Sequence, residues 1–312
     1  MANSSQTDIW ALADLETPWC LHTVVTLRVA EHMAAGKPVE DADPEALRRV
    51  LKHLAGKGVF VEEPDGTFTL NDAARQLMDP AIRLGLDLNG IGGRMAGAWS
   101  TLPSAVRAGR SMYQEQFQRS FWDDLGANPP IAESFHRLMG PEGHGMPDPR
   151  LTDWSQVQTV VDVGGGEGWL LAEILRANPH LKGTLVDLPE AVANAPKVFE
   201  NAGVGSRAEV SAQSFFEPLP AGRDVYVLKK VLSNWADREA LQILQRCAEA
   251  IGKTGVLITD VSPHPSPELL MLVLVGGKGR TKDDLAALAA QAGLQIVKQH
   301  GSLVELRATA SD

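Results

Sequence analysis

Three glycines at alternate positions separate a strongly apolar run from a run with helical spacing. They are Gly164, Gly166 and Gly168, in the segment VVDVGGGEG. Glycine lets the main chain turn tightly and lets a ligand approach where a Cβ atom would exclude it. A dinucleotide-binding turn needs its third glycine where this chain has Trp169, which argues against a pyrophosphate ligand. Taken alone, the pattern also fits a plain tight turn.

An acidic residue follows the next apolar segment at a distance that suits a nucleoside. Asp187 lies in the run LVDLPE, after the strand that should follow the glycine turn. In nucleotide-binding α/β folds, an acid about 20 residues beyond the turn accepts hydrogen bonds from ribose hydroxyls. Together, the glycine turn and Asp187 predict a ligand that contains a nucleoside.

The chain from residue 151 onward alternates between predicted strands and helices. The predicted strands are QTVVDVGG, GTLVDL, AEVSAQ, DVYVLKKVL and GVLITDVS, and the predicted helices are WLLAEILRANP, PEAVANAPKVFENAG, DREALQILQRCAEAIG and TKDDLAALAAQAG. Such alternation predicts an α/β fold with a mostly parallel sheet covered on both faces. LQIVKQHG and SLVELRATA predict a closing hairpin that adds an antiparallel edge and brings the sheet to seven strands.

The first 150 residues are predicted to be mainly helical. Apolar spacing indicates a helix over Ile9–Met33 and another over Pro44–Lys57, capped by Asp43. The run VFVEEPDGTFTLN then indicates a short hairpin, so that this part has the outline of a winged helix. DNA binding is one reading, but the surrounding region is acidic and lacks phosphate-binding residues. A scaffold or dimerisation module fits better.

The composition narrows the classes of function. The 312 residues include 29 Lys and Arg against 39 Asp and Glu, a formal net charge of −10, which argues against a nucleic-acid partner. No apolar run approaches the ~20 residues that span a membrane. Cys20 and Cys247 are the two cysteines, too few for a disulfide framework or a metal cluster. We therefore expect a soluble, cytoplasmic protein without a metal, membrane or nucleic-acid partner.

Several motifs, in order, resemble those of the S-adenosylmethionine-dependent small-molecule O-methyltransferases. They are VVDVGGGEG, LVDLPE, SFFEPLPAG, VLKKVLSNWADREALQILQRCAEA and VGGKGRT, and the resemblance covers nearly the whole chain. LADLETPWCLHTVVTLRVAEHM and RSFWDDLGANPPIAESFHRLM are most similar to bacterial enzymes that modify aromatic polyketides, such as anthracycline and naphthoate O-methyltransferases.

This resemblance implies a fold and its ligands. The expected fold is the Rossmann-like class I methyltransferase sheet over residues 151–312, the catalytic domain. S-adenosylmethionine is the implied cofactor, with S-adenosylhomocysteine as product and an aromatic small molecule as substrate. Residues 1–150 would form a helical domain that makes the homodimer and helps to wall the substrate pocket.

The resemblance also assigns roles to single residues. The implied cofactor contacts are Gly164 and Gly166 at the methionine and ribose, Asp187 with Leu188 at the ribose, Ser214 and Phe215 at the adenine, and Lys229 and Trp235 at the methionine end. Ser214 stands where the family usually has an acid, although its hydroxyl can still accept a hydrogen bond. Trp235 fits a core aromatic equally well.

The substrate side is implied by Trp122, Met139 and His144. His136 and His144 flank the expected pocket, and each also fits a histidine of the surface or of the pocket wall. Neither histidine is placed like the family's proton acceptor.

The family's usual base is missing. Many members carry His-Asp-Trp, and this chain has Ser233-Asn234-Trp235, while anthracycline-type relatives also have Asn-Trp without the His. Holding donor and acceptor in line removes much of a barrier, whereas a general base adds about 10²–10⁴-fold. The acceptor hydroxyl should therefore ionise easily. Ser233 and Asn234 are the candidate catalytic residues, or else they cap the helix that begins near Asp237.

The leading hypothesis is methyl transfer to a hydroxyl of an aromatic, polyketide-like metabolite. Two alternatives remain: hydroxylation or decarboxylation by the same fold with the same cofactor, and a non-catalytic winged-helix binding protein. Asp260 stands where the family often has Glu. The chain is also shorter than the family near residues 37–43, 141–150 and 262–268, either by true deletion or because loops are missing from this sequence.

Overall fold

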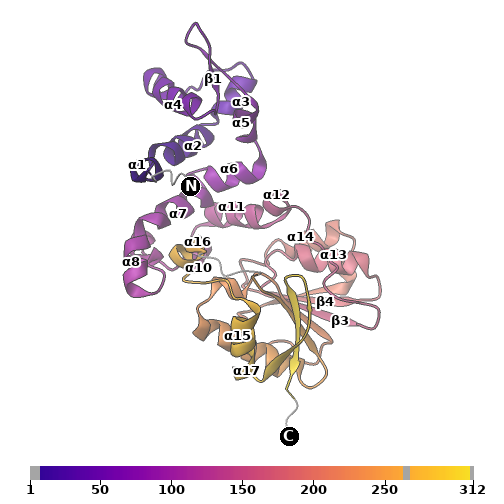
Figure 1. Cartoon of the computed structure of the whole chain (residues 1–312). Helices are drawn as coiled ribbons and strands as arrows, with labels where there is room; N and C mark the ends of the chain where they lie inside the picture. Colours follow the sequence, from indigo (N-terminus) through magenta and orange to yellow (C-terminus); the bar gives the residue numbers. More distant parts are fainter. Residues whose placement is uncertain (1–7, 263–267, 310–312) are drawn as a thin grey trace, which may run out of the picture. The chain divides into compact units, whose positions relative to one another are not determined.

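The computed structural model describes residues 8–262 and 268–309, and the chain divides into two compact units, Met1–Ala96 and Gly97–Asp312 (Figure 1). The sequence predicted a division near residue 150 instead. The change of rhythm there marks where strands begin, but packing decides which helices share a unit. The helices between residues 97 and 150 belong to the sheet unit, as described below.

The first unit consists of short helices and a two-stranded hairpin. Its elements are α1 (Ile9–Leu12), α2 (Glu16–Thr26), α3 (Val29–Ala34), α4 (Pro44–Gly56), β1 (Val61–Glu62), β2 (Phe68–Thr69), α5 (Asp72–Gln76), α6 (Pro80–Leu86) and the start of α7 (Ile91–Ala98). Their core gathers apolar side chains of α2, α3, α4 and α5, such as Val24, Val29 and Leu54.

The predicted helix Ile9–Met33 is wrong as one element, because the chain breaks it twice. The Asp14 carboxylate accepts the N–H groups of Glu16 and Thr17, which starts a new helix there. Arg28 has a φ of 55°, in the left-handed region, and so separates α2 from α3. Apolar spacing continues across both breaks, so spacing alone suggests one long helix.

The second helix and the hairpin are confirmed. Asp43 caps α4 by accepting the Ala46 N–H, and Pro44 is the first helical residue, where no N–H is needed. β1 and β2 pair in antiparallel fashion, with Val61 opposite Thr69. The winged-helix outline read from the sequence is therefore present.

The second unit is built on a seven-stranded sheet in the order β5-β4-β3-β6-β7-β9-β8. The strands are β3 (Thr159–Val163), β4 (Lys182–Asp187), β5 (Ala208–Ala212), β6 (Val225–Leu228), β7 (Val256–Asp260), β8 (Leu294–His300) and β9 (Leu303–Ala308). The first five are parallel, β9 runs antiparallel to β7, and β8 pairs antiparallel with β9. The predicted hairpin is present, with β8 outermost. β8 is exposed along most of its length, which suits an edge strand, whereas Val304 and Leu306 of β9 are buried.

Helices cover both faces of this sheet (Figure 1). One core packs α13 (Trp169–Ala177) and α14 (Ala195–Asn201) on residues such as Val160 and Leu185. The other packs α15 (Asp237–Ile251) and α17 (Lys282–Gln291) on residues such as Val161 and Tyr226. The sequence predicted that α14 begins at Pro189, but the helix begins at Ala195. Pro196 then lies in its first turn, where no N–H is needed.

The helices between residues 97 and 150 belong to the sheet unit. They are η1 (Trp99–Thr101), α8 (Leu102–Ala108), α9 (Tyr113–Phe117), α10 (Phe121–Ala127), α11 (Pro129–Met139) and α12 (Pro141–His144), and η2 (Gly205–Arg207), η3 (Leu232–Asn234) and α16 (Leu269–Leu274) complete the unit. The Ser111 hydroxyl donates to the carbonyls of Val273 and Leu274. The buried Tyr113 hydroxyl donates to Asp124, which fixes α10 to α9. In the described part of the chain, no helix is long and apolar enough to cross a membrane.

Candidate active site

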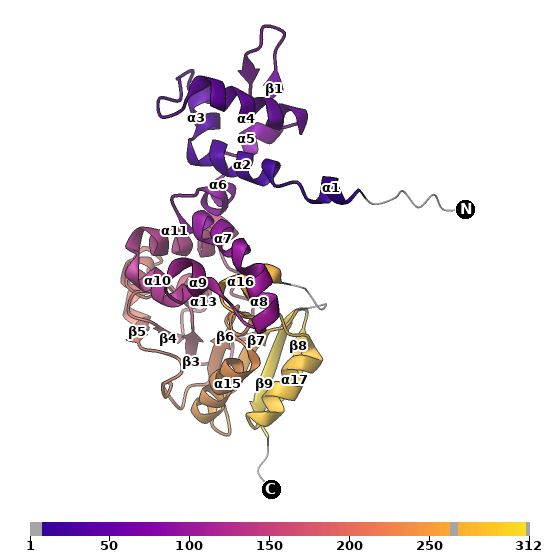
Figure 2. The same ribbon diagram turned by 90° about the vertical axis from the view of Figure 1, so that its left-hand side faces the viewer.

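The predicted cofactor residues meet at one edge of the sheet. Gly164 follows β3, Asp187 ends β4, Ser214 follows β5 and Lys229 follows β6. These strands are parallel, so their carboxyl ends lie along the same edge. From β3 the chain runs outward through β4 and β5 on one side, and then crosses from β5 to β6 on the other side of β3. Open α/β sheets bind ligands at such a switch point. α9, α10 and α11 lie over this edge (Figure 2).

The glycine turn adopts conformations that other residues rarely take. Gly164, Gly166 and Gly168 have φ values of 72°, 57° and 81°. A Cβ atom on Gly168 would lie 2.7 Å from the Phe199 ring, whereas one on Gly166 would meet nothing within 4 Å. The turn is therefore packed on its protein side and open at Gly166.

Asp187 holds this turn against the end of β4. Its Oδ2 accepts the Gly166 N–H at 2.8 Å, and its Oδ1 accepts the Leu188 N–H at 2.8 Å. Burial raises the pKa of the Asp187 carboxyl, against the lowering effect of these two N–H groups and of nearby His136. Each oxygen keeps lone-pair capacity for a further donor, because a carboxylate has about four acceptor sites.

A second carboxyl, Asp162, is enclosed beneath the turn. It is 2% exposed, and within the described structure its buried Oδ2 has no hydrogen-bond partner. A Cβ atom on Gly165 would lie 2.5 Å from this oxygen, so only glycine fits above it. Burial, together with the charge of Asp187, raises the pKa of Asp162 to about 7, although the Lys229 ammonium acts in the opposite direction.

Ser214 and Phe215 lie beside the turn. The Ser214 Oγ accepts the Phe216 N–H at 3.2 Å, and its own hydroxyl hydrogen remains for a ligand. The Phe215 ring would be 3.5 Å from a Cβ atom on Gly164. Phe215 thus closes one side of the glycine turn with an aromatic face.

An aromatic cluster joins this region to α10. Trp235 meets Phe215 and Phe216 edge to face at 5.9 and 5.0 Å between ring centroids. On its other side Trp122 stacks on Trp235 at 6.2 Å, with 22° between the ring planes. Trp235 packs partly against the sheet core, so both interpretations of its role, core aromatic and site wall, agree with its position.

Ser233 and Asn234 lie on the short helix η3, between β6 and α15. The Asn234 side chain donates from Nδ2 to the Lys230 carbonyl at 3.2 Å. α15 has Ala236 at its N-cap, without a side-chain capping bond. The alternative that Ser233 and Asn234 cap this helix is therefore wrong.

Met139 and His144 lie at the ends of α11 and α12. Met139 is 49% exposed, and the exposed His144 ring bonds through Nδ1 to the Leu138 carbonyl at 2.6 Å. Within the described residues, no hydrogen bond or ring contact joins His144 to the aromatic cluster. The structure thus brings Trp122 to the predicted cofactor residues directly, but not His144.

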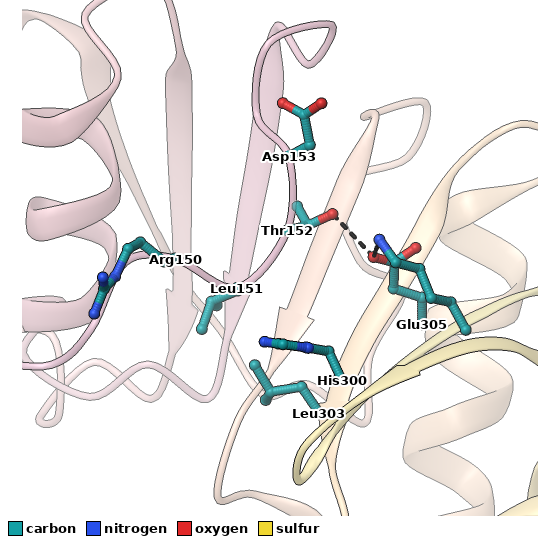
Figure 3. A pocket seen from close by; sticks show the side chains of 8 residues that line it. Arg150, Leu151, Thr152, Asp153, His300, Leu303 and Glu305 are labelled. Carbon is teal, nitrogen blue, oxygen red and sulfur yellow. Dashed lines mark hydrogen bonds and ion pairs between the residues drawn. The ribbon is translucent and has the colours of Figure 1, made fainter.

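A separate hollow of about 220 Å³ lies between residues 150–153 and the β8–β9 hairpin. Figure 3 shows Thr152 and Glu305 bonded across it, with Arg150 pointing away from His300 and Leu303. Its lining includes none of the predicted site residues. In the described part of the chain, no group of three or more His, Cys, Asp or Glu side chains is arranged to hold a metal ion.

Two residues of the site received no role from the sequence. Asp162 is signalled by an acid within an otherwise apolar strand, VVDVGG. Arg280, in VGGKGRT, is 5% exposed and bonds to the Leu232 and Trp235 carbonyls. Its motif is visible in the sequence, but no spacing rule connects it to residues more than forty positions earlier.

Comparison with known proteins agrees with this fold and site. A family model described as an O-methyltransferase domain matches residues 99–295. The chain therefore belongs to the O-methyltransferase family, as the resemblance implied.

The relatives are enzymes of bacterial secondary metabolism. A 2,7-dihydroxy-5-methyl-1-naphthoate 7-O-methyltransferase of Streptomyces carzinostaticus is 38% identical, with 96% of each chain covered. Aclacinomycin 10-hydroxylase of Streptomyces purpurascens is 37% identical, covering 93% of this chain and 84% of the relative.

Among solved structures, an O-methyltransferase from neocarzinostatin biosynthesis superposes with a TM-score of 0.91 and 38% identity, over 98% of this chain and all of that one. It was solved in complex with S-adenosylmethionine and 2-hydroxy-5-methyl naphthoic acid. The predicted class I methyltransferase fold and its cofactor are thereby confirmed.

Replacing Asp162 should change how stability depends on pH. The folded-state pKa of Asp162, about 7, exceeds its ordinary value of 3.8, so the charged form is disfavoured in the folded protein. The stabilisation that Asp162 gives the folded state is therefore fully present below about pH 4, and it is lost as the pH rises through about 7. Asp162→Asn cannot titrate, so between pH 5 and 9 it should lose about 1–4 kcal/mol less unfolding free energy than the wild type. Urea denaturation across this range measures the difference, and two parallel profiles would contradict it.

Proposed function

We propose that this protein transfers a methyl group from S-adenosylmethionine to a hydroxyl of an aromatic, polyketide-like metabolite. The observation that supports it most strongly is the meeting of the glycine turn, Asp187 and the Trp122–Trp235 stack at one edge of the sheet. A naphthoate-type acceptor is the first choice, because a 38% identical relative is a naphthoate O-methyltransferase. The same relationship supports a role in antibiotic biosynthesis.

The residues at this edge suit S-adenosylmethionine, which supplies an activated methyl group on a cationic sulfur. Gly166 is open on the side where a Cβ atom would point, so the main chain can be approached closely. The Asp187 carboxyl keeps acceptor capacity for hydroxyl donors beside its bonds to the Gly166 and Leu188 N–H groups. Both features suit a ligand with ribose hydroxyls.

Each predicted cofactor residue has a position that fits its proposed role. Gly164 and Gly166 would lie along the methionine and ribose, and Asp187 would accept from the ribose hydroxyls beside Leu188. Ser214 and Phe215 would contact the adenine, since they follow β5 next to the turn. Lys229 and Trp235 would close the methionine end.

The acceptor would lie on the side of the aromatic cluster formed with α10. Trp122 offers an indole face, and flat aromatic ligands stack on such faces. Met139 and His144 are proposed to line the outer part of this pocket, where α11 and α12 end. An acceptor held here would lie next to the proposed cofactor residues, because Trp235 contacts both Trp122 and Phe215.

Catalysis would depend chiefly on orientation. The Ser233 hydroxyl is too weakly basic to take a proton from a phenol. Asn234 already uses one amide hydrogen on the Lys230 carbonyl, which fixes its side chain. Its second amide hydrogen remains to hold the acceptor oxygen, and good alignment is itself worth a large part of a barrier.

Replacing Asp187 by Ala should weaken S-adenosylhomocysteine binding about tenfold or more, because hydrogen bonds to a charged group contribute ~1.5–3 kcal/mol. Calorimetry gives the dissociation constant. Asp224→Ala is a matched control, because this carboxylate also accepts two N–H groups, of Gln158 and Thr159, but at the opposite edge of the sheet. Equal affinity for the Asp187 variant and the wild type would refute the ribose role.

Incubation with hydroxylated naphthoates should give products heavier by one methylene, and a gain of one oxygen instead would indicate the hydroxylase chemistry of the 37% identical relative.

The rate should follow the ionisation of the acceptor. We expect kcat/KM to rise as the pH passes the pKa of the acceptor phenol. Along a series of phenols, the pH at which this rise occurs should follow the pKa of each phenol. Ser233→Ala should change kcat by less than about threefold, far below the loss of a general base. Asn234→Ala should lower kcat more than Ser233→Ala does, because it removes the amide that is proposed to hold the acceptor oxygen in place. A folded, cofactor-binding Ser233→Ala enzyme that has lost activity a thousandfold would show that Ser233 does chemistry of its own.

We further propose that the chain forms a homodimer through its first unit. Large apolar side chains of α1 and of the link to α2 are exposed there, including Trp10 at 87%, Leu15 at 74% and Leu12 at 72%. Monomeric proteins rarely leave such a patch uncovered.

Cys20 and Cys247 are both free thiols, in keeping with the proposed cytoplasmic location.

Light scattering at micromolar concentration should give twice the chain mass. Trp10→Glu combined with Leu12→Glu should shift the protein toward the monomer, since it places charge on the patch. Val210→Glu, an exposed apolar residue of the second unit, serves as the control and should stay dimeric. A monomeric wild type would end this proposal.

A further inference from the structure

The turn that carries Ser233, Asn234 and Trp235 is held by one buried guanidinium. Arg280 is 5% exposed. Its Nη1 donates to the Leu232 carbonyl at 2.6 Å, and its Nη2 donates to the Trp235 carbonyl at 2.9 Å. One side chain therefore binds the main chain at both ends of the turn.

The charge of this guanidinium is balanced by Asp237, two residues after the turn. Asp237 Oδ1 accepts from Arg280 Nη2 at 2.8 Å, and its Oδ2 accepts from Lys278 Nζ at 2.8 Å. Although burial acts to raise it, the pKa of Asp237 is lowered by its bonds to Lys278 and Arg280. A buried charge that is paired and fully hydrogen-bonded has a well-defined geometry, because losing either partner is costly.

Gly277 touches the middle of the same turn. A Cβ atom on Gly277 would lie 2.0 Å from the Ser233 carbonyl oxygen and 2.6 Å from the Asn234 carbonyl carbon. The short segment 277–280 thus contacts each residue from Leu232 to Trp235, through glycine in the middle and arginine at the ends.

Hydrogen bonds anchor this segment at its C-terminal end. The Arg280 carbonyl accepts the Ser262 N–H at 2.8 Å. The next residue, Thr281, starts α17 with a capping box formed with Asp284. The chain just before the turn of residues 232–235 is also fixed, because the Asp260 carboxylate accepts the Lys230 N–H at 2.7 Å.

We propose that Arg280 and Gly277 are positioning residues for methyl transfer, which act through the main chain of residues 232–235 without contacting substrate. The inference rests on the proposed roles of Asn234 and Trp235. In a site without a strong base, alignment supplies most of the rate. A loosened turn should therefore lower kcat, and not only stability.

Arg280→Ala, Arg280→Lys and Gly277→Ala test the proposal with steady-state kinetics and hydrogen exchange. A misplacement of ~1 Å can cost about 100-fold, so kcat should fall about 10–100-fold for Arg280→Ala and Gly277→Ala, with a smaller change in KM for the acceptor. Arg280→Lys keeps the charge but has a single nitrogen, and it should lie between wild type and Arg280→Ala. Amides of residues 232–235 should exchange faster in all three variants, whether or not they turn over.

Arg207→Ala is the matched control. Its guanidinium also bonds to main-chain carbonyls, of Leu175 and Leu181 at 2.9 Å each, where α13 ends and the next strand begins. This variant should lose stability but keep its kcat and the slow exchange of residues 232–235. If Arg280→Ala behaves in the same way, Arg280 has only a structural role and the inference fails.

Failure of the inference can be told from failure of the proposed function. A wild type that methylates, with kcat and exchange unchanged in folded Arg280 and Gly277 variants, overturns the inference alone. A wild type that gives no methylated product overturns the proposed function, and exchange at residues 232–235 then decides whether these residues hold the turn. Gly277→Ala keeps the test decisive if Arg280→Ala does not fold.

Discussion

The bond between the Asp187 carboxylate and the Gly166 N–H is the interaction on which the candidate site depends. It ties the turn after β3 to the end of β4, while the Gly164 N–H bonds to the Val186 carbonyl at 2.7 Å. A chain that folds back so closely must pass through left-handed conformations, which explains the three glycines. Phe199 and Asp162 fill the space beneath the turn. Only the outer side, at Gly166, remains open to a ligand.

Two acids lie at this turn, and burial disfavours the ionisation of both. Burial raises the pKa of both Asp162 and Asp187, and the Asp187 charge adds to the shift at Asp162. Their position therefore disfavours an anionic ligand group and favours a cationic one. A ligand that combines hydroxyl donors with positive charge, as the proposed cofactor does, would suit this environment.

The sequence predicts the repeating parts of this protein better than its exceptions. Alternating runs identify the seven strands of the larger sheet, and the glycine turn with Asp187 predicts the candidate site, because both predictions follow from local patterns. The break at Arg28, the start of α14 at Ala195 and the grouping of residues 97–150 with the sheet depend on tertiary packing. Arg280 lies more than forty residues after the turn that it holds, so a single sequence offers no signal for that contact.

The aromatic cluster restricts how an acceptor can enter. Trp122 and Trp235 are 6.2 Å apart and nearly parallel. Carbon atoms in contact are about 3.5–4.0 Å apart, so a third ring between two others needs about 7 Å or more. A flat acceptor at the proposed pocket would therefore lie against one indole or beside both, unless the two indoles separate. Trp235 is held by Phe215, Phe216 and the Arg280 bond to its carbonyl. Trp122 is packed in turn against the rings of Phe121 and Phe135, with centroids 5.0 and 6.1 Å away. Both indoles are thus supported by further rings, and such a fixed aromatic wall would suit the proposed alignment of a flat acceptor with the methyl donor.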